Sequence, residues 1–125
     1  MAYDEEVAAR MRDGLIGLPD VREVKMMGGV CFLLSGNMVG GVFNERADRE
    51  RAGVPLFMFR VGKENVPEAL ALPDVSHMIN GQRRMNGFVR IAAEECSDDD
   101  LATLISMSVS FVGSLPPKAG DQSHE

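Results

Sequence analysis

The segment of residues 25–43, KMMGGVCFLLSGNMVGGVF, constrains the fold more than any other part of this sequence. A glycine pair at 28–29 separates a polar–apolar alternation, typical of a half-buried strand, from an apolar run at 30–34. The residues Ser-Gly-Asn at 35–37 are favoured in tight turns, so the apolar run at 38–43 predicts a returning partner strand. A second glycine pair inside that strand predicts a β-bulge or a close approach of another backbone.

Helices are predicted near both ends of the chain and once between them. Apolar residues recur at helical spacing in residues 4–18, and carboxylates occupy the first turn. Ser97 followed by three aspartates predicts a capped helix start, and an uncharged amphipathic helix extends from there to the proline pair at 116–117. Residues 65–72 begin with Asn-Val-Pro-Glu, which predicts a short helix with the asparagine as its cap.

The remaining segments predict strands and loops. Residues 56–61 and 87–92 are mostly apolar and predict two further strands. The charged residues 44–54 predict a solvated loop or a short helix. Residues 73–86 are expected to be irregular, with an additional brief strand near residues 77–79.

Together these elements predict a single α+β domain over residues 1–117. We expect two layers: an antiparallel sheet of four to five strands, and helices packed mainly on one of its faces. The expected element order is α-β-β-β-α-β-α. Residues 118–125 are polar and predict a disordered tail.

Charge and cysteine usage narrow the class of protein. The formal net charge is −6, which disfavours contact with a phosphate backbone, so we expect no direct binding of nucleic acid. The two cysteines, Cys31 and Cys96, lack any close-spaced zinc pattern, and we expect them to be free thiols. Neither an apolar leader nor a membrane-spanning run is present, so a cytoplasmic protein is expected.

Three patterns resemble chemical sites, and each has a simpler structural explanation. Lys25 stands near a glycine pair, but a phosphate-binding loop requires a helix after the glycines, and a strand is predicted here. Cys31 lies in an apolar strand and would need His77 as a base, so it is predicted to be a core residue. The aspartates at 98–100 fit a helix N-terminus better than a cation loop. We therefore expect no catalytic residue, metal or cofactor.

The strands at 30–34 and 56–61 are apolar on both faces, although one helix layer covers only one face of a sheet. An uncovered apolar face is a strong association surface. We therefore expect a homodimer or a protein partner, bound through that face or through the last helix. The alternative is a small-ligand-binding protein or enzyme with a pocket near Lys25, Arg60 and Arg83.

Three motifs carry a resemblance to a known family: Lys25-Met26-Met27-Gly28-Gly29, Gly36-Asn37-Met38, and Arg60-Val61-Gly62 before a short helix. They resemble the TfoX N-terminal domain family, whose members carry a Lys-Met-Phe-Gly-Gly-like motif followed by Gly-Asn-Met. The resemblance extends over nearly the whole chain. It implies a small α+β domain with a regulatory or protein-interaction role. It makes the motif positions the candidate site residues: Lys25, Met26, Gly28, Gly29, Gly36, Asn37, Met38 and Arg60.

Two substitutions depart from the family pattern. Met27 stands where the family usually has phenylalanine, and Phe88 stands where it often has tryptophan in the last strand. Both changes keep apolar bulk, so the predicted fold is unaffected. Longer TfoX/Sxy regulators of natural competence carry an additional C-terminal helical domain, so a competence role is not among the functions that we expect from the resemblance.

Overall fold

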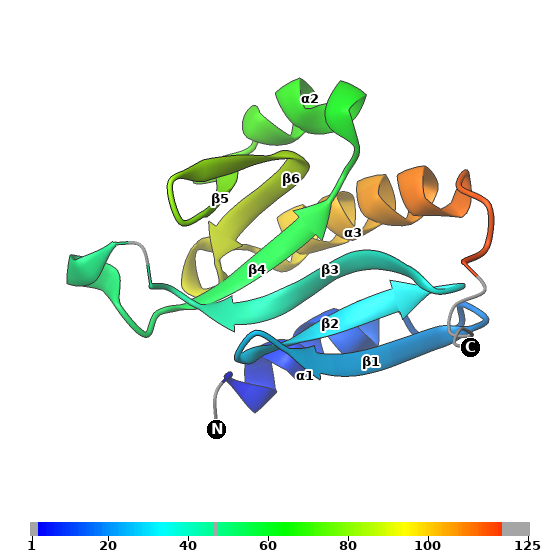
Figure 1. Cartoon of the computed structure of the whole chain (residues 1–125), viewed down its shortest axis with the longest axis horizontal. Helices are drawn as coiled ribbons and strands as arrows, with labels where there is room; N and C mark the ends of the chain where they lie inside the picture. Colours follow the sequence, from blue (N-terminus) through cyan, green and yellow to red (C-terminus); the bar gives the residue numbers. More distant parts are fainter. Residues whose placement is uncertain (1–2, 47, 119–125) are drawn as a thin grey trace.

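A computed structural model describes residues 3–46 and 48–118. The apolar and alternating segments of the sequence form one antiparallel sheet (Figure 1). Within these residues the strands are β1 (Val21–Met26), β2 (Gly29–Leu34), β3 (Asn37–Asn44), β4 (Pro55–Arg60), β5 (Ser76–Asn80) and β6 (Arg83–Ala92). Their spatial order is β1-β2-β3-β4-β6-β5. The helices are α1 (Glu5–Gly14), α2 (Val66–Leu70) and α3 (Asp98–Gly113).

The α+β class is confirmed, but the strand number and the element order need correction. The sheet has six strands rather than four to five, and four strands instead of three precede α2. The brief strand expected near residues 77–79 is present as β5, but residues 73–86 are not mainly irregular, because β5 forms a hairpin with the first part of β6 there. Gly81 and Gln82 form the turn between the paired residues Asn80 and Arg83, and glycine at the first turn position, with a φ of +67°, is a hairpin signal that the sequence contained.

Two-residue turns join the first three strands. Met27 and Gly28 both have positive φ, +53° and +77°, between the paired residues Met26 and Gly29. Such turns match the right-handed twist of the strands that they connect. Ser35 and Gly36 repeat this geometry between β2 and β3, so the predicted turn is confirmed, although Asn37 already begins β3.

The glycine pair of β3 lies at a β-bulge, as predicted. Phe32 pairs with Gly40 and Leu33 pairs with Met38, so Val39 is an extra residue in β3. Val39 belongs to the core on the helix side, and a Cβ atom on Gly40 would meet Met11 of α1. Both residues therefore face the helices, and this shifts Met38 to the opposite face of the sheet.

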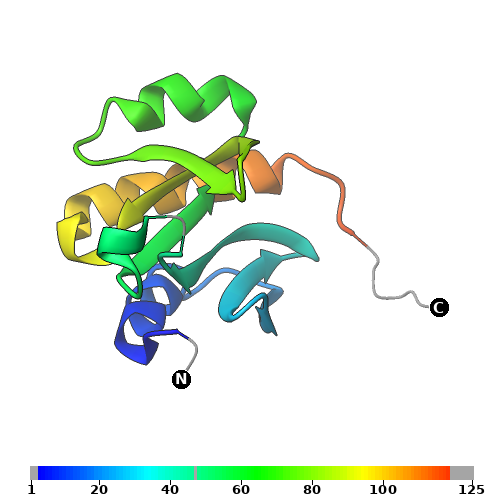
Figure 2. The same cartoon turned by 60° about the vertical axis from the view of Figure 1, so that its left-hand side comes forward.

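Helices α1 and α3 cover one face of the sheet, and α2 packs against β6 (Figure 2). The side chain of Ser97 accepts a hydrogen bond from the amide of Asp100, which confirms the predicted cap of α3. Helix α1 ends at Gly14 rather than near residue 18, because shorter turns that contain Gly17 at φ +94° follow it. The short helix α2 begins after a 3₁₀ turn, and Asn65 does not cap it.

The core between the helices and the sheet contains one polar side chain with no hydrogen-bond partner among the described residues. Ser108 of α3 is fully buried and faces the sheet with Leu104 and Val112. Its neighbour on the outer side of the helix, Ser110, is exposed. Ser108 therefore lacks the hydrogen bond that buried hydroxyl groups normally make.

The predicted charged segment at 44–54 contains a single 3₁₀ turn, Arg49–Arg51, within its described residues. Most of the predicted tail, residues 119–125, lies outside the described residues. None of the helices in the described chain has the length and apolar character needed to span a membrane.

Candidate functional site

The face of the sheet away from α1 and α3 contains a groove. Successive residues of a strand point to opposite faces, so Phe57 and Phe59 of β4 pack into the helix-side core while Leu56 and Met58 point to the other face. Leu56 and Met58 line the groove, which has a volume of about 660 Å³. This volume lies within the range of sites that bind small molecules or single side-chain anchors.

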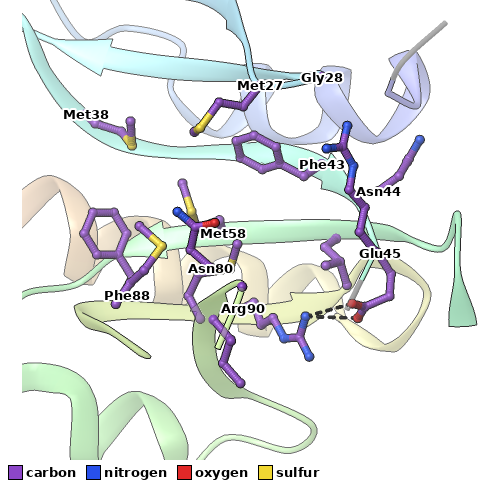
Figure 3. Close-up of a pocket in the computed structure, with 16 residues that line it drawn as sticks. Met27, Gly28, Met38, Phe43, Asn44, Glu45, Met58, Asn80, Phe88 and Arg90 are labelled. Atoms are coloured by element: carbon purple, nitrogen blue, oxygen red, sulfur yellow. Dashed lines mark hydrogen bonds and ion pairs between the residues drawn. The ribbon is translucent and has the colours of Figure 1, made fainter. Parts of the chain in front are cut away.

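Methionine is the most frequent residue type in the lining of the groove (Figure 3). Five of the nine methionines of the chain contribute to it: Met27, Met38, Met58, Met78 and Met85. They come from the β1–β2 turn, from β3 and β4 at the floor, and from the β5–β6 hairpin, which forms one wall. Methionine side chains are flexible and polarizable, so such a lining can adapt to apolar groups of different shapes. The groove is therefore an adaptable apolar surface.

An ion pair closes one end of the groove. Arg90 of β6 donates through Nη1 to both carboxylate oxygens of Glu45, at 3.0 and 3.2 Å. The Glu45 side chain is only 5 % exposed, and its carboxylate also accepts the amide of Asp48 at 3.1 Å. Phe88 lies at the other end of the groove, beyond Met58 (Figure 3). The groove therefore has a charged end and an aromatic end.

Met27 stands at the rim and is 63 % exposed. It occupies a turn position with φ +53°, where glycine and asparagine are the favoured residues. A methionine at this position carries a backbone cost of about 1 kcal/mol. Packing does not explain its presence, because most of the side chain is open to solvent.

A second hollow of about 540 Å³ adjoins the aromatic end of the groove, and Phe88 lines both. The guanidinium carbon of Arg60 lies 5.5 Å from the centroid of the Phe111 ring of α3, a cation–π arrangement. Arg60 makes no ion pair with any other described residue, and Lys63 lines the same hollow. Glu64 lines it as well, so two cationic side chains and one carboxylate border this hollow.

The candidate residues from the sequence are distributed over several places. Met38 and Gly28 line the groove, and Arg60 lines the adjoining hollow. Lys25 is exposed on the edge strand β1, and Arg83 is exposed on β6; neither lines the groove or the hollow. Lys25 and Arg83 thus do not join Arg60 in either of these two hollows.

The glycine pair at the first turn has a structural role. Gly28 is a turn residue, and its missing side chain leaves room for the guanidinium group of Arg46. A Cβ atom on Gly29 would meet the carbonyl oxygen of Val42 and the ring of Phe43. Met26, before the turn, is half-buried and lines neither the groove nor the hollow.

Gly36 and Asn37 hold the C-terminal strap, defined as residues 114–118. The amide of Lys118 donates to the carbonyl of Ser35 at 2.8 Å, and the side-chain amide of Asn37 donates to the carbonyl of Pro116 at 3.0 Å. A Cβ atom on Gly36 would lie 2.9 Å from the Cβ of Lys118. Figure 1 shows the strap returning to the end of the sheet where β2 ends. These two motif positions therefore bind the chain's own C-terminal segment.

The thiols show the behaviour of core residues. Cys31 and Cys96 are both buried and free, and burial raises the pKa of each thiol to about 11. Nucleophilic cysteines need the opposite, a lowered pKa and an accessible position. Among residues 3–46 and 48–118, no cluster of three or more histidine, cysteine, aspartate or glutamate side chains is arranged to hold a metal ion.

No family model, curated protein or solved structure matches this chain. The functional assignment therefore rests on the groove and the hollow. Most of their residues were absent from the sequence-based candidates, since Met58, Met78, Met85, Glu45 and Arg90 come together only when the sheet forms. Gly81, at the first position of the β5–β6 turn, was a local signal that could have placed these two strands together.

Proposed function

We propose that this chain is a non-catalytic interaction module, resembling the TfoX N-terminal domain, which binds an apolar segment of a partner protein in the methionine-lined groove. The observation that supports this most directly is the composition of the open sheet face. Methionine-rich surfaces accommodate varied apolar side chains and are used by proteins that bind several peptide partners. We place the protein in the cytoplasm, where its two thiols stay reduced.

The rim of the groove supports the same proposal. Met27 and Ile79 are exposed by 63 % and 39 %, and both line the groove. Exposed apolar residues clustered around a hollow are characteristic of association surfaces. The positive φ of Met27 adds a backbone cost that is explained if its side chain contacts a bound partner.

A second copy of the chain is the other occupant suggested by the sequence. In the single chain, however, Met58 is only 2 % exposed and Leu56 only 7 % exposed. The β5–β6 hairpin forms a wall over this face, so little flat apolar surface remains for a symmetric dimer. A groove of this shape suits an inserted segment better. The alternative of a small-ligand pocket shared by Lys25, Arg60 and Arg83 receives no support from their positions.

Methionine methyl groups provide a direct test. The protein is labelled with [ε-¹³C]methionine and titrated with the acetylated, amidated hexapeptide Leu-Thr-Leu-Val-Leu-Asn. We expect the methyl signals of Met38, Met58 and Met85 to shift and that of Met11 to stay unchanged, because Met11 is buried on the helix side. Unchanged groove methyl signals at millimolar peptide would refute the proposal.

A matched pair of variants locates the binding. Met85→Gln removes a half-buried methionine from the groove wall, and Met107→Gln removes a half-buried methionine from α3 in the helix layer. We expect the first to weaken peptide binding about fivefold, which corresponds to the loss of roughly 1 kcal/mol of apolar contact. The second leaves affinity unchanged. Equal effects would mean that the peptide binds elsewhere. Sedimentation at micromolar concentration determines whether a second copy occupies the groove instead.

A further inference from the structure

The groove and the hollow adjoin each other at Phe88, and together they are called the track. Leu56, Met58 and Arg60 alternate along β4, so their side chains leave the same face of the sheet. The first two line the groove, and Arg60 lines the hollow. Phe88 is the cross-strand neighbour of Arg60 and lines both. From Leu56 to Arg60 the track spans roughly 13 Å, about the length of four extended residues.

Arg60 is held in place without a neutralising partner. Its guanidinium group lies over the Phe111 ring, and no described carboxylate lies within ion-pair distance of it. A Cβ atom on Gly62 would meet the Phe111 ring at 2.5 Å, so the absence of a side chain there lets the ring approach. An arginine fixed on an aromatic face is oriented before a ligand arrives, and its planar fork matches a carboxylate.

The charges of the track contrast with those of the whole chain. The chain has a formal net charge of −6. The groove and the hollow are lined by four cationic and two anionic side chains: Arg46, Arg60, Lys63 and Arg90 against Glu45 and Glu64. Glu45 is already paired with Arg90 at the far end of the groove. Arg46 leaves one excess positive charge at that end, and Arg60 and Lys63 against Glu64 leave another at the hollow, where the Phe111 ring holds the Arg60 guanidinium group.

We propose that the partner segment carries an acidic residue at one end of its apolar run, and that Arg60, with Lys63 beside it, binds this carboxylate. The apolar side chains fill the methionine-lined groove, and the backbone crosses over Phe88. The partner is thus an amphipathic acidic peptide. This inference depends on the proposed function, because it identifies the chemistry of the segment that the groove binds.

A pair of isosteric peptides tests it on the wild-type protein. The first is the hexapeptide described above, ending in asparagine, and the second is Leu-Thr-Leu-Val-Leu-Asp, acetylated and amidated in the same way. We expect the aspartate peptide to bind about tenfold more tightly, the gain typical of a charge-assisted hydrogen bond. This preference shrinks as salt is added, because Arg60 is only half-buried.

Two variants with the same net charge as each other show which residue causes the preference for the aspartate peptide. Arg60→Gln removes the cation over Phe111, and Arg49→Gln removes an exposed arginine outside the groove and the hollow. Arg60→Gln should bind both peptides equally, whereas Arg49→Gln should keep the tenfold preference. Lys63→Gln should reduce the preference about twofold to threefold, and it alters an exposed side chain that the fold does not need.

The outcomes separate this inference from the proposed function. If both peptides shift the groove methyl signals and bind equally to the wild type, the acidic specificity is refuted and the interaction module stands. If neither peptide shifts them, both proposals fail. Binding of octanoate without binding of either peptide would overturn the peptide partner in favour of a free amphiphilic acid.

Discussion

Replacing Ser108 by alanine should stabilise the protein. Its hydroxyl group is fully buried in α3 and has no hydrogen-bond partner among the described residues. A buried hydroxyl left without a partner costs about 1–3 kcal/mol. Alanine also has the higher helix propensity, by about 0.5 kcal/mol. The lost contacts of one oxygen atom, at about 0.1–0.2 kcal/mol each, offset part of this gain.

The expected net effect of Ser108→Ala is a gain of about 1.5 kcal/mol in the free energy of unfolding. For a domain of this size the melting temperature should rise by roughly 5 °C. Urea denaturation followed by circular dichroism measures the gain as a higher midpoint at an unchanged slope. Ser110→Ala is the matched control, because Ser110 is exposed on the same helix and its replacement changes only helix propensity.

A gain of no more than about 0.5 kcal/mol for Ser108→Ala, equal to that of Ser110→Ala, would refute the reasoning. It would mean that the hydroxyl group is satisfied in solution. The most direct way is a rotation of the side chain toward the backbone carbonyl one turn earlier in the helix. A loss of stability would mean that the hydroxyl contributes a hydrogen bond on which the packing of α3 depends.

Three other predictions concern the strap, an ion pair and a thiol. Gly36→Ala should accelerate hydrogen exchange in the C-terminal strap and lower the free energy of unfolding by about 1 kcal/mol more than Gly53→Ala does. Both glycines have φ near +85°, but only Gly36 faces another segment. Equal losses of stability in the two variants would disprove the contact. The hydrogen bond from Arg12 lowers the pKa of Glu23 below 4.5, the ordinary pKa of a glutamate side chain. The pair therefore stabilises the fold above pH 4.5, and this stabilisation is lost as the pH falls below that value. Because both side chains are about one third exposed, Glu23→Gln should lower the free energy of unfolding by less than about 1 kcal/mol at pH 7 and by less at pH 2.5 than at pH 7; an equal loss at both pH values would contradict this. Cys31 should resist a thiol reagent at pH 8 in the native protein and react only at the rate of unfolding, because burial raises its pKa to about 11; fast labelling without unfolding would refute this.

The sequence predicted the local features of the fold well where one residue type determines the backbone. Gly36 identified a tight turn, Ser97 identified the start of α3, and the glycine pair of β3 identified a bulge. Each of these depends on the chemistry of a few adjacent residues, so the printed sequence contains the necessary information. A brief strand was expected near residues 77–79, but its hairpin with β6 was missed because β5 and the first part of β6 are mostly exposed and polar, and β6 is held in the sheet by pairing with β4.

The candidate site was harder to predict for a different reason. The open face of the sheet was expected from the apolar strands, but the groove depends on side chains distant in sequence, such as Met27 and Met85. Glu45 belonged to a segment predicted to be solvated, yet it is buried in an ion pair with a residue of β6. Pairing of this kind is a tertiary property, and charge alone in the sequence does not reveal it. Arg60 was a candidate from its motif, and the structure adds the Phe111 ring that orients it.

The bulge at Val39 makes the groove sensitive to chain length. Because side chains in a strand alternate with a period of two residues, the extra residue determines which face Met38 occupies. Deletion of that single residue would turn Met38 toward the helices, even though every remaining side chain stayed the same. When this chain is compared with other sequences, an insertion or deletion at the glycine pair of β3 would therefore alter the groove more than most substitutions would. A gap placed one position wrongly in an alignment would assign core residues to the groove and groove residues to the core.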